Sequence, residues 1–232
     1  RHSINLWDDT PETPTYVGGS RHRHNGAFAG VTDIQGFDIY ISACAPYIMD
    51  YGNFPPLRSP YDYAHAVRRN HMPWPTWIYS HGMLGKKDPV REPAPSELWV
   101  QALSPILAGA KGLMYFQTNM GGARRRPASW EAIGQANRMI RGVRAFLVEG
   151  DPTGLAQAGR DDVLAEAIRA RDAIVVPVVD VSAHRAMDDF RCLLEEDPHW
   201  ELAPVGTYVR VRVPDDFAPV EILEVIDGTV RA

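Results

Sequence analysis

The stretch Leu107-Ala-Gly-Ala-Lys-Gly-Leu-Met-Tyr-Phe116 joins the end of a helical pattern to a short apolar run. Gly109 and Gly112 lie at the ends of a predicted tight turn, because glycine adopts the backbone conformations that close a helix. The run that follows is apolar without alternation, which is typical of a buried strand. We therefore predict a helix, a turn and a buried strand in succession, as in many α/β proteins.

The sequence on both sides of this unit alternates between strand-like and helical patterns. The helical patterns occupy about residues 60–70, 96–110 and 129–148, and the strand-like patterns occupy residues 4–8, 36–42, 77–81 and 113–118. This alternation indicates a parallel sheet with crossover helices. Ser129 is expected to cap the longest helix, with an apolar stripe on one face and Arg138, Arg141 and Arg144 mostly on the other.

After Asp151-Pro152 the pattern changes, since helix signals become scarce and strand-like segments follow one another. These segments are residues 172–182, 207–213 and 220–225. Tyr208 to Val213 alternate strictly between polar and apolar character, as in a half-solvated antiparallel strand. We predict an α/β domain over residues 1–150 and a β-rich, sandwich-like packing domain over residues 151–232. Asp227-Gly228 is a turn-like pair that needs a returning strand, so we expect this domain to be truncated at Ala232.

Composition excludes several classes of function. The chain has 232 residues with a net charge of −5, and it therefore lacks the positive field that nucleic-acid or membrane-surface binding needs. Cys44 and Cys192 match no metal spacing, so we predict no metal site and no cofactor. The chain has no run of 18 or more apolar residues, so we expect no membrane span.

The order of these pieces resembles the C-terminal part of glycoside-hydrolase-like (β/α)8 TIM barrels with an appended β-sandwich, broadly the family 42 β-galactosidase group. The pieces look like the sixth strand, the seventh strand, the helix before the eighth strand, the eighth strand and the last helix. The segments that carry the resemblance are Thr32-Asp-Ile-Gln-Gly-Phe-Asp-Ile-Tyr40, Pro75-Thr-Trp-Ile-Tyr-Ser-His-Gly82, Pro95-Ser-Glu-Leu-Trp99, the stretch 107–116 and Ser129-Trp-Glu-Ala-Ile133.

Because such a barrel typically needs ~250 residues, the resemblance implies that residues 1–150 are its second half and that the chain is a fragment. A small open α/β sheet that is complete in itself is the alternative. The resemblance also implies a carbohydrate substrate, hydrolysis of glycosidic bonds and an extracellular or periplasmic location.

Barrel active sites lie at the carboxyl ends of the strands, so the polar and aromatic residues there are the candidates for binding sugar. Period two places Asp38 and Tyr40 on one face of their strand and the apolar residues on the face toward the helices. Flat aromatic rings offer stacking surfaces, while imidazole and amide groups bond hydroxyls. The predicted substrate-binding residues are Trp7, Asp9, Tyr40, Trp77, His81, Gln117 and Asn119.

Glycoside hydrolysis commonly needs two carboxyl groups, and the resembled families carry glutamates at the ends of the fourth and seventh strands. Here the fourth strand would precede Arg1, and the seventh ends in Tyr79-Ser-His81. Asp38 is the best catalytic candidate, and Glu92 in a nearby loop is the second. Glu97, in a first helical turn, is interpreted as favouring the helix dipole.

Two rival functions stay open. The missing glutamate of the seventh strand favours a barrel that binds a glycan without cleaving it, and a self-contained α/β interaction module is the other possibility. Arg124-Arg-Arg126 is either a solvated loop or a contact for uronate or sulfate groups. Arg21-His-Arg-His24 is interpreted as a solvated segment rather than a metal site.

Overall fold

The fold is given by a computed structural model. It describes residues 34–38, 56–71, 77–83, 95–116, 127–182, 206–218, 221–226 and 229–231. Side chains are described for most of these positions, and only the backbone for the rest, which include most of β1 and all of β2. All statements below concern these residues.

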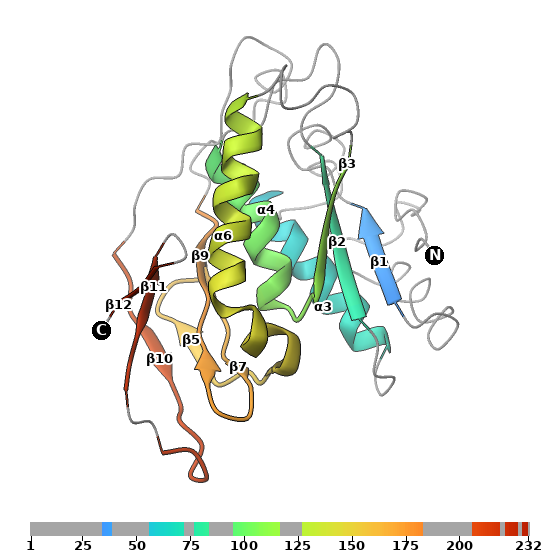
Figure 1. Cartoon of the computed structure of the whole chain (residues 1–232). Helices are drawn as coiled ribbons and strands as arrows, with labels where there is room; N and C mark the ends of the chain where they lie inside the picture. Colours follow the sequence, from blue (N-terminus) through green and yellow to red (C-terminus); the bar gives the residue numbers. More distant parts are fainter. Residues whose placement is uncertain are drawn as a thin grey trace.

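The first three described strands form a parallel sheet in the order β1-β2-β3 (Figure 1). Helices α3 and α4 connect them in sequence, and the short 3-10 helix η1 (Pro56–Arg58) precedes α3. The elements are β1 (Ile34–Asp38), α3 (Ser59–His71), β2 (Trp77–Met83), α4 (Pro95–Leu107) and β3 (Gly112–Phe116). The pattern of alternating strands and helices therefore holds for these elements, although β1 begins two residues earlier than expected.

The turn between α4 and β3 has the predicted form. Gly109 has a φ of 99°, and its N–H donates to the carbonyl of Ile106 at 2.9 Å. The N–H of Ala110 donates to the carbonyl of Pro105, also at 2.9 Å. These two bonds form a Schellman motif, which closes a helix with a left-handed residue. The chain can thus reverse direction over four residues and enter β3.

Helix α6 (Pro127–Glu149) is the longest described element. The predicted cap at Ser129 is wrong, because the helix begins at Pro127, whose fixed φ suits a first turn and whose missing N–H costs nothing there. Its apolar stripe is confirmed: Ala132, Ile133, Ala136 and Leu147 are buried, and the three arginines of the opposite face are exposed.

Short antiparallel strands make up the regular structure after residue 150. Strands β4, β7 and β8 form one sheet, and the remaining pairs are β5 with β10, β6 with β9, and β11 with β12. Their bounds are β4 (Asp151–Pro152), β5 (Ala156–Ala158), β6 (Val163–Ala165), β7 (Ile168–Arg169), β8 (Ile174–Val175), β9 (Val178–Asp180), β10 (Val209–Val211), β11 (Glu224–Ile226) and β12 (Thr229–Arg231). The last pair flanks Asp227-Gly228, so the expectation that the returning strand of this hairpin is missing is wrong: β12 is that strand.

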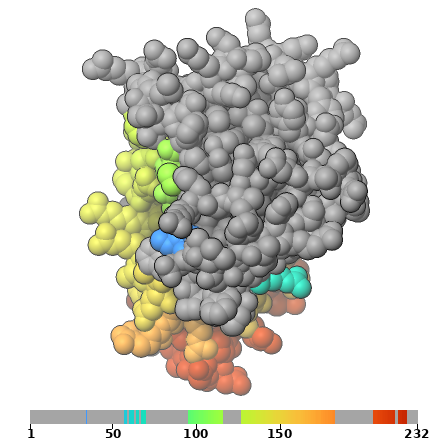
Figure 2. All heavy atoms as spheres, turned by 90° about the vertical axis from the view of Figure 1, so that its right-hand side faces the viewer, coloured from blue at the N-terminus to red at the C-terminus, as the bar shows by residue number. Residues whose placement is uncertain are grey.

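The helices lie between the parallel sheet and these short strands (Figure 1). Figure 2 shows α6 above the C-terminal strands when the molecule is viewed from the side of β1. One buried cluster joins the two sides, because Val100 and Leu107 of α4 pack with Ile168 and Val181. Described residues from before and after position 150 therefore share a core, and the division into two domains stays a prediction.

The two faces of the parallel sheet differ. Leu113 and Tyr115 pack against clusters formed by the helices, whereas Met114 is 41% exposed and Ile34 is 45% exposed. The described helices thus cover one face of the sheet. Parallel sheets are usually covered on both faces, and in the predicted barrel the uncovered face would be the interior one.

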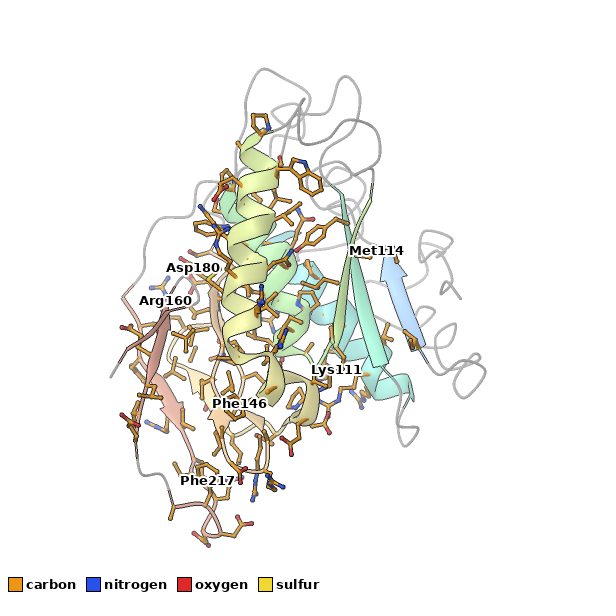
Figure 3. The ribbon with its side chains drawn as sticks, viewed as in Figure 1. Lys111, Met114, Phe146, Arg160, Asp180 and Phe217 are labelled. Carbon is orange, nitrogen blue, oxygen red and sulfur yellow. The ribbon has the colours of Figure 1, made fainter. Side chains whose placement is uncertain are left out.

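Lys111 ties the start of β3 to the end of α6 (Figure 3). Its ammonium group donates to the carbonyl of Leu147 at 2.7 Å and to the carbonyl of Gly150, and lies 3.8 Å from Asp151. Burial lowers the pKa of Lys111, against the opposite influence of Asp151. Arg68 of α3 also reaches Asp151, at 3.6 Å. This clamp joins the start of β3, the end of α6, β4 and α3 at the amino end of the sheet.

The turn at Gly109 generates a prediction with a matched control. A Cβ at position 109 would lie 3.1 Å from the Pro152 ring, whereas one at Gly154, where φ is 71°, would meet nothing within 4 Å. Both alanine variants lose ~1–2 kcal/mol to the left-handed backbone. We expect Gly109→Ala to lose roughly 1 kcal/mol more in urea unfolding, because tight packing resists added atoms. Equal losses would show that the approach to Pro152 is unimportant.

Candidate functional site

Two predicted site residues become neighbours at the carboxyl edge of the parallel sheet. Asp38, the last residue of β1, is paired with His81 of β2, and His81 is paired with Met114 of β3. Adjacent strands lie about 4.8 Å apart, so the backbones of Asp38 and His81 are in direct apposition. For these two residues the backbone alone is described. A carboxylate and an imidazole, predicted from separate strands, thus share one register position.

The row that contains Asp38 and His81 ends at a residue that faces away from the helices. Met114 is exposed, and Figure 3 shows it on β3, while its neighbours Leu113 and Tyr115 pack on the helix side. The predicted alternation of β1 has the same form, with apolar residues toward the helices and Asp38 on the other face. The candidate site is therefore this row, which lies at the last residue of β1 and two residues before the ends of β2 and β3. The predicted end of the second strand at His81 is wrong, because β2 continues to Met83.

Trp77 is not brought to that edge. It is the first residue of β2 and is paired with Ile34, four residues before the pairing of His81 with Asp38. At about 3.3 Å per residue, Trp77 lies roughly 13 Å from His81 along the strand. The other predicted site residues lie outside the described residues: Trp7, Asp9, Tyr40, Glu92, Gln117 and Asn119.

The first turns of α4 and α6 lie beside the carboxyl end of β3. Leu98 of α4, Ile133 of α6 and the partly buried Tyr115 share one cluster. The indole N–H of Trp99 donates to the carbonyl of Ala132 at 3.1 Å and so ties the two helices together. Glu97, which was interpreted as favouring the helix dipole, lies in the first turn of α4 as predicted and is only 1% exposed. It belongs to the helix layer, on the side of the sheet opposite to Met114.

A buried polar stripe runs along α4 from this point. Glu97, Gln101 and Ser104 follow the four- and three-residue spacing of one helix face, and all are buried. Neither amide atom of Gln101 has a hydrogen-bond partner, nor do the hydroxyls of Ser104 and Tyr115. Burial raises the pKa of Tyr115 to about 12. Unpaired buried polar groups cost about 1–3 kcal/mol each, so this stripe weakens the helix layer.

Sequence reasoning missed this stripe, although its signal was present. The spacing of Glu97, Gln101 and Ser104 places polar groups on a single face of a helix that is otherwise apolar. Such a face is ordinarily solvated, and here it is buried because α4 packs against α3, α6 and strands on both sides of the helix layer.

A cluster of titratable side chains lies at the start of α3. Arg58 donates to Asp62 Oδ1 at 3.2 Å and to the carbonyl of Asp161 at 3.2 Å, while Oδ2 of Asp62 is buried without a partner. Burial raises the pKa of Asp62 to about 6, although Arg58 opposes the shift. Tyr61 stacks on His65, and burial followed by the charge of Glu166 raises its pKa. The cluster ties α3 to the segment between β5 and β6.

Within the described residues, no group of three His, Cys, Asp or Glu side chains is arranged to hold a metal ion. None of the described helices is long and apolar enough to cross a membrane. Comparison with models of protein families, with curated proteins and with solved structures finds no match to this chain. The site must therefore be interpreted from its own chemistry.

The cluster at Asp62 predicts a pH dependence of stability. The folded-state pKa of about 6 exceeds 3.8, the ordinary pKa of an aspartate side chain, so the folded protein holds this proton more tightly. The resulting stability is fully present below pH 3.8 and is lost as the pH rises through about 6. We expect wild type to lose about 2–3 kcal/mol from this group between pH 4 and pH 8, and Asp62→Asn to lack that loss.

Urea unfolding at several pH values measures this difference. Asp172→Asn is the control, because that carboxylate and its partner Arg171 are both exposed. If Asp62→Asn and wild type showed parallel pH profiles, the carboxyl of Asp62 would not be the group that titrates.

Proposed function

We propose that this chain is a carbohydrate-active protein of glycoside-hydrolase type, which holds a sugar at the carboxyl edge of its parallel sheet. The observation that carries the proposal is the register that pairs Asp38 with His81 at the end of β1. Barrel enzymes place their reacting groups at this edge of the sheet. The resemblance of residues 1–150 to the second half of a (β/α)8 barrel leads to the same edge.

The pair offers the chemistry that a sugar needs. A carboxylate accepts hydrogen bonds from hydroxyl groups and exchanges a proton with the glycosidic oxygen or with water. A neutral imidazole donates a hydrogen bond from one ring nitrogen and accepts one at the other. We assign Asp38 as the acid or base and His81 as the residue that orients it or bonds a sugar hydroxyl.

The uneven cover of the sheet supports the barrel part of the proposal. Helices pack on the side of Leu113 and Tyr115, while Ile34 and Met114 are exposed on the other side. In a closed barrel, the second face of each strand packs against side chains of the remaining strands. Further strands would cover Ile34 and Met114 in this way.

Binding without cleavage is the second candidate, and one observation favours it. Hydrolysis by the usual route needs two carboxyl groups that flank the bond. Among the described residues near the edge, Glu97 lies in the helix layer, away from the row of Asp38. Glu92, which lies outside the described residues, is the remaining candidate for the second carboxylate. Without a second carboxylate, Asp38 could still accept hydrogen bonds from sugar hydroxyls, although the bond would not be cleaved.

The test uses the whole chain, a panel of neutral oligosaccharides and two readouts, the release of reducing ends and calorimetric binding. If the protein cleaves, Asp38→Asn should lower kcat by at least ~100-fold with a small change in binding, since it removes an acid or base. His81→Asn should weaken binding and cleavage together. Asp172→Asn, on an exposed side chain that pairs with Arg171, should change neither.

Glu92→Gln separates the two candidate functions. Loss of cleavage in both Asp38→Asn and Glu92→Gln identifies a carboxylate pair and a hydrolase. Binding by wild type without cleavage, lost in Asp38→Asn, identifies a glycan-binding protein. If wild type neither binds nor cleaves any member of the panel, the proposal is wrong.

A further inference from the structure

One face of strand β10 presents an aromatic ring followed by two arginines. Tyr208, Arg210 and Arg212 are exposed, while the intervening Val209 and Val211 are half-buried. Because side chains alternate along a strand, the three exposed residues share one face at steps of about 6.6 Å. Gln157 of β5 is paired with Arg210 and is also exposed, which extends this face across two strands. We call these four residues the β10 face.

The ring of Tyr208 is held in place by its neighbour across the strands. The N–H of Gly159 donates to the carbonyl of Tyr208 at 2.9 Å. A Cβ at position 159 would lie 2.6 Å from Cε1 and 2.8 Å from Cζ of the ring, so the ring occupies the space that a side chain would need. Tyr208 is nevertheless 64% exposed. Part of the ring thus rests on Gly159, and the rest is free to receive a flat ligand.

The two arginines of the β10 face have no ion pair or hydrogen bond from their side chains to any described residue. Several other described arginines are neutralised locally, for example Arg160 by Asp162 at 2.5 Å and Arg169 by Asp216 at 2.7 Å, whereas the exposed Arg141 and Arg144 of α6 also form no ion pair with a described residue. The backbone N–H of Arg212 donates to the carbonyl of Leu155 at 2.9 Å, which fixes the strand that carries both guanidinium groups. The strand therefore holds Arg210 and Arg212 at fixed backbone positions, and their guanidinium groups are unpaired.

These groups fit a charged sugar chain. A guanidinium group forms two parallel hydrogen bonds with a carboxylate or sulfate, and an aromatic face stacks on a flat apolar surface such as that of a sugar ring. From Tyr208 to Arg212 the strand spans about 13 Å, enough for a short oligosaccharide. The net charge of −5 disfavours long polyanions such as nucleic acid, whose affinity depends on many positive contacts.

We propose that the β10 face binds acidic oligosaccharides that carry uronate groups, with Tyr208 as the stacking surface and Arg210 and Arg212 as the carboxylate ligands. This inference goes beyond the proposed function, because it assigns an acidic glycan to a second surface and leaves the neutral sugar at the sheet edge as proposed above. The face lies on the other side of the helix layer from the parallel sheet (Figure 1), so it acts as a separate binding surface.

The test measures calorimetric binding of tetragalacturonate and of its fully methyl-esterified form, which has the same chain without the charges. Wild type should bind the acid at least 10-fold more tightly than the ester, with affinity that falls as salt rises. Arg210→Gln and Arg212→Gln should each lower the affinity for tetragalacturonate at least fivefold. The lysine variants should recover part of this loss, because an ammonium group keeps the charge and loses the fork geometry.

Two further variants test the ring. Tyr208→Ala should weaken binding of the acid and the ester alike, since it removes stacking. Gly159→Ala should weaken both while Tyr208 is still present, because the new Cβ displaces the ring. Arg171→Gln is the control, since Arg171 is exposed and already paired with Asp172. Thermal melting verifies that each variant is folded.

The outcomes separate this inference from the proposed function. The inference is supported if Asp38→Asn binds tetragalacturonate as tightly as wild type and the Arg210 and Arg212 variants do not. This holds even if the sugar site proposed at the sheet edge is wrong. Equal affinity for acid and ester, or no effect of the β10 variants, overturns it. Tighter binding of a short single-stranded DNA with the same dependence on Arg210 and Arg212 also overturns it, in favour of a nucleic-acid surface.

Discussion

The buried ammonium of Lys111 is the interaction on which the rest of the described structure depends. It bonds the carbonyls of Leu147 and Gly150 and lies beside Asp151, which also approaches Arg68. A lysine among the last carbonyls of a helix satisfies groups that have no partner inside the helix. Because Lys111 directly precedes β3, this one side chain sets the position of α6 against the sheet and against the strands that follow.

From this clamp, the helix layer carries the two surfaces to which we assign sugar binding. On one side, the parallel register brings Asp38 opposite His81. On the other side, β10 pairs with β5 and presents Tyr208 above Gly159. The shared core of Leu107, Ile168 and Val181 makes the helices a common support for both. The polar stripe of Gln101 and Ser104 weakens this support, a cost that functional proteins often carry close to a site.

Local chemistry in the sequence predicted the local structure well. The glycines after α4 predicted the turn, and the apolar spacing of α6 predicted its buried face. Non-local packing was not predictable in this way. Burial of Glu97 depends on the elements that pack around α4, and the position of the Tyr208 ring depends on a glycine nearly fifty residues away. The apposition of Asp38 and His81 needed the register, which strand patterns give only to within a few residues. The barrel, its sugar site and the domain boundary stay predictions.

Hydrogen exchange of the intact chain, with and without a saturating neutral oligosaccharide from the binding panel, tests the central claim most directly. Amide protection reports which backbone segments a ligand orders. The account predicts that peptides ending β1 at Asp38 and containing His81 of β2 slow their exchange together, while the peptides of α3 change little. Protection that leaves both strand ends unchanged, in the presence of measured binding, would contradict a sugar site at the carboxyl edge of the sheet.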